Sequence, residues 1–139
     1  RFDPYEADDE KIADMLANDL ILGWVNGKYE IGPRALGNRS ILAAPFRDSI
    51  RTRLNEIKQR ERFRPIAPVC LEEDAARWLG CDHMSPHMLY TYIARTDALA
   101  AVTHVKSIKG VKSPLDCMLN LWPTFFPSCP RPLSIFYFC

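Results

Sequence analysis

The chain has 139 residues, of which 47% are hydrophobic and 25% charged, and its formal net charge at pH 7 is +1. These values are typical of one folded domain and exclude a disordered or fibrous chain. The near-neutral total gives no indication of a nucleic-acid or membrane partner, and no apolar run reaches the roughly 18 residues that a membrane span needs. Five cysteines without CxxC spacing favour reduced thiols in a cytoplasmic protein.

The charged residues are distributed unevenly along the chain. Residues 1–27 carry two basic and seven acidic side chains, whereas residues 28–64 carry ten basic and four acidic ones. The second segment is therefore where an anionic ligand would bind. The first residue is Arg1 rather than methionine, so we expect a piece of a longer polypeptide.

The first half of the chain predicts two helices with a strand between them. Apolar residues at helical spacing predict helices over residues 5–18 and 49–58. The apolar run at residues 20–27 ends in Asn-Gly and predicts a buried strand followed by a tight turn. Residues 28–31 are a possible start of a second strand.

The next segments predict further strands and a short helix. "RPIAPVCL" at residues 64–71 contains two prolines and fits an extended edge segment. "EEDAARWLG" at residues 72–80 predicts a helix closed by Gly80. The β-forming residues at 87–94 and 100–105 predict two more strands. Mixed strands and helices place the fold in the α/β or α+β class.

Residues 110–139 differ from the rest of the chain. They hold five of the eleven prolines and three of the five cysteines, with three charged residues. Prolines at this frequency break helices and central strands, so we predict no regular element here. The segment is interpreted as an atypical Pro- and Cys-rich tail that follows a domain at residues 1–109.

Two groups of basic residues are the candidates for a binding or catalytic site. In "GPRALGNRS" the glycines allow close backbone approach to a ligand, and donors come from Arg34, Asn38, Arg39 and Ser40. The alternative is a surface loop that leads into a strand, with Arg34 merely exposed.

The second group follows the second predicted helix. If the chain is extended after Lys58, one side of the segment carries a row of cations at Lys58, Arg60, Arg62 and Arg64. Arginine forks suit phosphate and carboxylate groups, so such a row implies an anionic ligand. The alternative is a solvated helix face that includes Arg51, Arg53 and Arg62.

Other sites are not indicated by the sequence. The three histidines, His83, His87 and His104, have no metal-ligand spacing with the cysteines, and no metal site is expected. The sequence has no P-loop and no GxGxxG.

Two stretches, "GPRALGNRSILAAP" and "LNEIKQRERFRPIAPVCLEE", resemble the C-terminal domain of the carbamoyltransferase family that includes nodulation protein U and antibiotic O-carbamoyltransferases. "SPHMLYTY" and "AVTHV" follow in the same order as in that family, so the resemblance covers roughly residues 8–106. It implies a YrdC/Sua5-like fold, a twisted mixed sheet flanked by helices. The fold is expected to be incomplete at its C-terminus, because the family's later Asn-Thr-Ser-Phe-Asn segment is absent.

The resemblance also implies a function. Such domains use ATP, with Mg²⁺, and carbamoyl phosphate to make carbamoyl adenylate, and a preceding Kae1-like domain that holds its own metal transfers the carbamoyl group to a hydroxyl. The family's K-x-R pattern falls on Lys58 and Arg60 as catalytic residues. Substrate or nucleotide binding is carried over to Arg34, Asn38, Arg39, Ser40 and Arg64.

Some features depart from the family pattern. Arg62 stands where the family commonly has an aromatic residue, so no role is assigned to it. The Kae1-like domain is expected to be missing from this chain, and acceptor recognition would belong to it. Two alternatives therefore stay open: a non-catalytic module that binds phosphate or nucleic acid, and an inactive truncated product.

Overall fold

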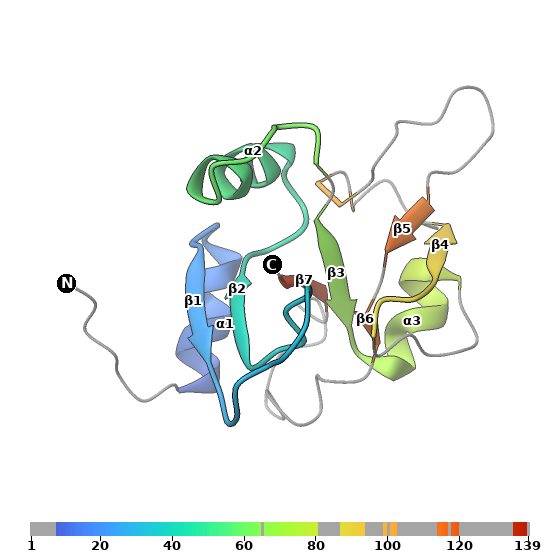
Figure 1. Cartoon of the computed structure of the whole chain (residues 1–139), viewed down its shortest axis with the longest axis horizontal. Coiled ribbons are helices and arrows are strands. Elements are labelled where there is room, and N and C mark those ends of the chain that lie inside the picture. Colours follow the sequence, from blue (N-terminus) through green and yellow to red (C-terminus); the bar gives the residue numbers. More distant parts are fainter. Residues whose placement is uncertain are drawn as a thin grey trace.

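The computed structural model describes residues 8–64, 66–80, 87–93, 99, 101–102, 114–116, 118–119 and 135–138. Its helices and strands are interleaved along the chain (Figure 1), which confirms the predicted mixed α/β class. The described strands form three small sheets, with the orders β1-β2, β6-β3-β7 and β4-β5. In the described part of the chain, no helix is long and apolar enough to cross a membrane.

Helix α1, Asp9–Ala17, begins with a side-chain cap and buries one apolar face. The Asp8 carboxylate accepts a hydrogen bond from the backbone N–H of Glu10 at 3.1 Å, which satisfies one of the free donors of the first turn. The side chains of Ile12 and Leu16, one turn apart, are buried. The helix thus confirms the predicted periodicity, and the predicted residues 5–7 lie outside the described residues.

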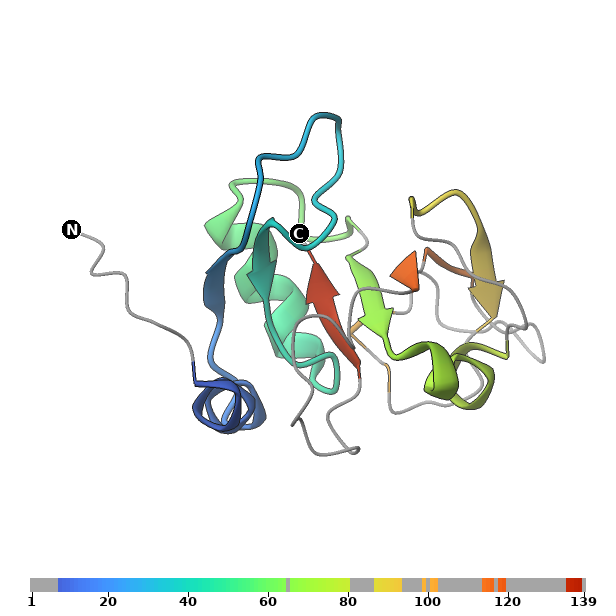
Figure 2. The same cartoon turned by 90° about the horizontal axis from the view of Figure 1, so that it is seen from below.

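Strands β1, Leu22–Val25, and β2, Arg39–Leu42, form an antiparallel hairpin in which Trp24 lies opposite Ser40. β1 is half-buried rather than buried, because every second residue faces solvent. The prediction of a strand start at residues 28–31 is wrong, since these residues lie in the long loop at 26–38. Figure 2 shows this loop projecting from the face of the hairpin opposite α1.

Helices α2, Asp48–Ile57, and α3, Glu72–Leu79, confirm their predictions within a residue. The buried face of α2 consists of Ile50, Leu54 and Asn55. Helix α3 ends at Gly80, whose φ of 64° is the left-handed conformation that glycine adopts without a steric penalty.

Strand β3, Ala67–Cys70, is central in its sheet rather than at an edge, so that prediction is wrong. It pairs in parallel with β6, Met118–Leu119, and antiparallel with β7, Ile135–Phe138. Pro68 is tolerated inside β3, opposite Tyr137, although it has no N–H to donate. The free thiol of Cys70 is fully buried.

The structure also departs from the prediction that residues 110–139 hold no regular element. Besides β6 and β7 they supply β5, Pro114–Asp116, which pairs antiparallel with β4, Thr91–Ile93. Strand β4 lies inside the strand predicted at 87–94, and the prediction is wrong for residues 87–90, which are not in a strand. Residues 101–102 form a turn, so the strand predicted at 100–105 is wrong there, and the other residues of that prediction lie outside the described ones.

Two groups of buried side chains make the core. One joins α2 and α3 to β3 and includes Ile50, Leu54, Cys70 and Leu79, with Trp78 partly buried against it. The other joins α1 to β2 and β3 and consists of Ile12, Leu16, Leu42, Val69, Leu71 and Met88, with Trp24 partly buried against it. Strand β7 lies beside β2 as well as β3, which brings the hairpin against the central strand (Figure 1). The loop at 26–38 and the segment after α2 therefore extend from packed elements.

Candidate functional site

The loop at 26–38, which contains the Gly-Pro-Arg motif, closes around a carboxylate of the protein itself. Glu30 accepts hydrogen bonds from the backbone N–H groups of Leu36 at 2.6 Å, Asn38 at 3.1 Å and Arg39 at 3.1 Å. The side-chain amide of Asn38 donates to the same carboxylate at 3.4 Å. Much of the donor capacity in this motif therefore stabilises the loop.

The guanidinium group of Arg39 is also used inside this loop. It donates to the backbone carbonyls of Asn26 at 2.9 Å, Gly27 at 3.2 Å and Asn38 at 2.8 Å. It lies over the ring of Tyr29, 4.6 Å from the ring centroid, in a cation–π contact. Arg39 therefore holds the two ends of the loop together.

Ser40 and Trp24 fix the second end of the loop at Gly37. The backbone N–H of Gly37 donates to the Ser40 hydroxyl at 3.2 Å, and the indole N–H of Trp24 donates to the Gly37 carbonyl at 2.9 Å. Gly37 has a φ of 98°, a conformation that L side chains rarely adopt, so glycine is required here. Ligand contacts by Asn38, Arg39 and Ser40 stay a prediction, and each of these residues already has a structural role.

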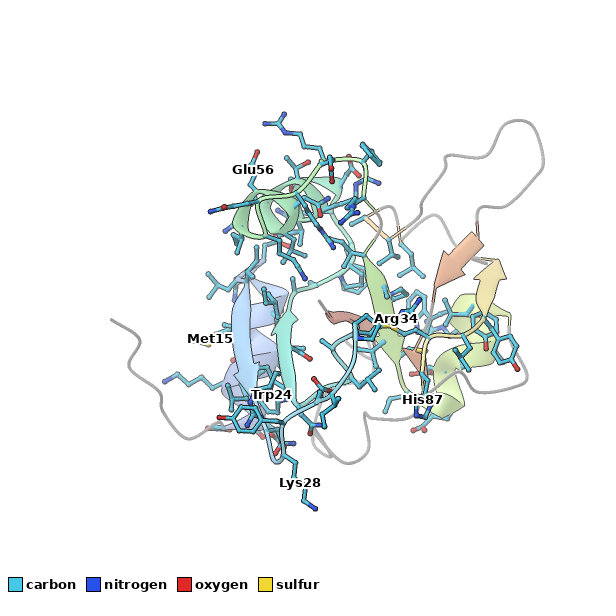
Figure 3. All side chains as sticks on the ribbon, in the orientation of Figure 1. Met15, Trp24, Lys28, Arg34, Glu56 and His87 are labelled. Atoms are coloured by element: carbon cyan, nitrogen blue, oxygen red, sulfur yellow. The ribbon has the colours of Figure 1, made fainter. Side chains whose placement is uncertain are left out.

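Arg34 is one of two exposed cations in this loop, together with Lys28. Its side chain is exposed and has no hydrogen bond or ion pair with any residue in the described ranges. Figure 3 shows Arg34 in front of the region between β2 and β3. Its guanidinium group is thus available to an anion.

The segment after α2 is a tight reversal rather than an extended strand. The N–H of Gln59 donates to the Glu56 carbonyl and the N–H of Arg60 to the Asn55 carbonyl, both at 3.0 Å. With Lys58 as the C-cap and Gln59 at a φ of 51°, this is a Schellman motif. A second turn follows, in which the N–H of Arg64 donates to the Glu61 carbonyl at 3.1 Å.

These turns rule out the predicted row of four cations on one extended face. Arg62 forms an ion pair with Glu56 at 3.0 Å, and Arg64 forms one with Glu61 at 3.3 Å. Lys58 is exposed and has no partner among the described residues. Lys58 thus resembles Arg34 in being available, whereas Arg62 and Arg64 are already paired.

Asn55 connects α2 to this segment. Its side chain is fully buried, and its amide N–H groups donate to the carbonyls of Arg62 and Arg64, each at 3.1 Å. Its Oδ1 accepts a hydrogen bond from Nε of Arg60. One asparagine therefore positions both the backbone after α2 and the guanidinium group of Arg60.

The cations of the loop at 26–38 and those of the loop at 58–64 are not joined to each other. In the part of the chain that the structure describes, no hydrogen bond or ion pair joins Arg34 to Lys58 or Arg60. Figure 3 shows Glu56, at the end of α2 that leads into the second loop, well away from Arg34. Convergence of these cations on a common ligand remains a prediction.

Sequence reasoning missed Glu30 and Asn55, the residues that organise the two loops. Asn55 did leave a signal, because it directly follows Leu54 on the apolar face of a helix, where an asparagine needs buried partners. Glu30 left a weaker signal, a carboxylate ahead of a donor-rich Gly-Pro turn. Neither spacing identifies the partners, which only the folded loops define.

Comparison with known proteins identifies the family of this chain. Residues 13–111 match the family described as carbamoyltransferase C-terminus. A 3'-hydroxymethylcephem-O-carbamoyltransferase of Amycolatopsis lactamdurans is 47% identical over 108 residues, which are 77% of this chain and 21% of that protein. A protein of the same name from Streptomyces clavuligerus is 42% identical over 121 residues, 82% of this chain and 23% of the relative.

The similarity extends to nodulation proteins. Nodulation protein NolO of Bradyrhizobium diazoefficiens is 44% identical over 100 residues, which are 67% of this chain and 18% of that protein. The chain thus spans about a fifth of the length of these relatives. The family match contains both the loop closed by Glu30 and the segment held by Asn55. The chain belongs to the carbamoyltransferase C-terminus family.

Proposed function

We propose that this chain is the nucleotide-handling part of an O-carbamoyltransferase, which forms carbamoyl adenylate from ATP and carbamoyl phosphate for transfer to a small-molecule hydroxyl. The family and the names of the relatives support carbamoyl transfer. The observation that carries the proposal is that Arg34 and Lys58 lie on two loops closed by internal hydrogen bonds, and that both side chains are exposed without a partner in the described chain, as is Lys28.

The chemistry needs cations held in fixed positions. ATP and carbamoyl phosphate are both anionic, so their approach requires positive groups that offset the repulsion between phosphates. In this proposal Lys58 and Arg60 neutralise phosphate oxygens while the adenylate forms, and Arg34 and Arg64 bind the nucleotide or carbamoyl phosphate. Mg²⁺ is bound together with ATP. The molecule that carries the acceptor hydroxyl binds to a separate Kae1-like domain, and the reaction takes place in the cytoplasm.

The test is ligand binding by the chain and by a double variant. Lys58→Ala with Arg60→Ala removes two charge-assisted donors, so we expect about 100-fold weaker binding of Mg-ATP or carbamoyl phosphate in calorimetric titrations. The matched control is Arg47→Ala with Arg53→Ala, which changes the net charge equally. Arg47 pairs with Asp19 at 2.7 Å and Arg53 donates to the Asp19 carbonyl at 3.2 Å, so both lie outside the proposed site. Equal binding by the two double variants would contradict the proposal.

A nucleic-acid module would give a different result in the same titrations. It would bind RNA with a steep salt dependence, and ATP would not compete. The pairing of Arg62 with Glu56 lowers the positive charge that a long phosphate backbone would meet along this loop. Arg62 has no role in the proposed binding of small anions, so this ion pair favours the small anionic ligands.

A further inference from the structure

We propose that Asn55 is a positioning residue that fixes the guanidinium group of Arg60 and the loop at 58–64 for anion binding; this inference rests on the proposed function. Asn55 lies one turn before the C-cap of α2 and its side chain is fully buried. Both donors of its amide are used, because Nδ2 donates to two carbonyls, and Oδ1 accepts a hydrogen bond from Arg60.

From helix α2, the side chain of Asn55 forms hydrogen bonds with three residues of the loop at 58–64. Arg60 is held through Nε by a side chain of α2, so the helix sets the position of its guanidinium group. The carbonyls of Arg62 and Arg64 are held at 3.1 Å each, so the second turn is anchored to the helix as well. A guanidinium group fixed before the ligand arrives loses less rotamer entropy on binding.

Burial makes these contacts specific to asparagine. A buried amide or carbonyl without a partner costs free energy, so the loop conformation that satisfies Asn55 is favoured over alternatives. Alanine leaves both carbonyls and Arg60 without this partner. Aspartate keeps an acceptor for Arg60 and replaces the donor to both carbonyls with an oxygen.

Limited trypsin digestion tests the anchoring directly. Trypsin cleaves after Lys58, Arg60 and Arg62, and the bond after Arg62 includes a carbonyl that Asn55 holds. In Asn55→Ala we expect cleavage in this loop to be about tenfold faster or more, because two hydrogen bonds to backbone carbonyls are lost. If Asn55→Ala does not fold, Asn55→Asp provides the same test, with the increase confined to the bond after Arg62.

The matched control is Leu54→Ala, which truncates the fully buried neighbour of Asn55, an apolar side chain that has no hydrogen bond to lose. Each variant is digested at a temperature the same number of degrees below its own unfolding midpoint. Differences in overall stability then do not affect the comparison of cleavage rates. Equal cleavage of the loop in the two variants would show that Asn55 only fills space, and would overturn the proposal.

Ligand-binding measurements distinguish a role of Asn55 in positioning Arg60 from a role in folding alone. Asn55→Ala should weaken binding of Mg-ATP or carbamoyl phosphate about tenfold in the otherwise unaltered chain and by a smaller factor in the Arg60→Ala background, where only the anchoring of the loop backbone is lost. An equal effect in both backgrounds would overturn action through Arg60. If the unaltered chain binds neither ligand, the proposed function fails, and the trypsin comparison still supports or overturns the anchor on its own.

Discussion

Glu30 shows how a single side chain can decide what a sequence motif does. Three backbone N–H groups of the Gly-Pro-Arg loop converge on its carboxylate, at 2.6 to 3.1 Å. The sequence correctly indicated that this loop gathers donors for an anion. It did not indicate that the loop provides an anion of its own, because the partners lie six to nine residues from Glu30 and meet only after the turn forms.

Replacing Glu30 with glutamine tests the importance of this carboxylate. One oxygen becomes an NH₂ group that faces backbone donors, so we expect a loss of about 1–3 kcal/mol in the free energy of unfolding. Urea unfolding followed by tryptophan fluorescence measures this loss, since Trp24 donates to the same loop. The control Glu73→Gln alters an exposed carboxylate on α3 and should change stability by less than about 0.5 kcal/mol. Similar losses in the two variants would show that Glu30 contributes no special stability.

The helices end in the same way, but with different residues at the reversal. Asp19 follows α1 with a φ of 60° and Gln59 follows α2 with a φ of 51°, whereas Gly80 follows α3 with a φ of 64°. The N–H of Leu20 donates to the Met15 carbonyl at 3.1 Å, so the end of α1 is also a Schellman motif. Two of these positions therefore hold a side chain in a conformation that favours glycine.

This difference predicts opposite effects of two substitutions. Gln59→Gly removes the steric penalty and should raise the free energy of unfolding by about 0.5–1 kcal/mol, because the penalty exceeds the added entropy of the unfolded chain. Gly80→Ala introduces the same penalty and should lower it by about 1 kcal/mol. Thermal and urea unfolding of both variants measures the signs. Destabilisation by Gln59→Gly would mean that its side chain makes a compensating contact.

Helices were predictable from the sequence because their periodicity is local, and α2 and α3 begin within a residue of the prediction, whereas α1 begins at Asp9, four residues after its predicted start. The position of β3 was not predictable in this way. Its partners come from residues 118–119 and 135–138, some 50 to 70 positions along the chain. Two prolines near β3 favoured an edge, and backbone pairing between distant segments overrode that local signal.

The whole molecule depends on its last strands more than its composition indicated. β3 lies between β6 and β7, and β7 also lies beside β2 (Figure 1). The motif order along the sequence was enough to identify the family. The distance between the two cationic loops was not predictable, because it depends on how the hairpin and α2 pack around β3.

Truncation after residue 111 tests this dependence. Such a chain keeps the residues of the family match and loses β5, β6 and β7, so β3 is left without its neighbouring strands. We expect the cooperative thermal transition seen by circular dichroism to move to a lower temperature or to disappear, since buried backbone groups would lose their partners. An unchanged midpoint would show that these strands add nothing to the stability of the domain.

The burial of Cys70 gives this fold a built-in chemical probe. Its thiol lies in β3, between the two strands that the C-terminal residues provide, and is shielded from solvent. An alkylating reagent reaches this sulfur only when the strand separates from its neighbours, so the rate of labelling measures how often the centre of the molecule opens.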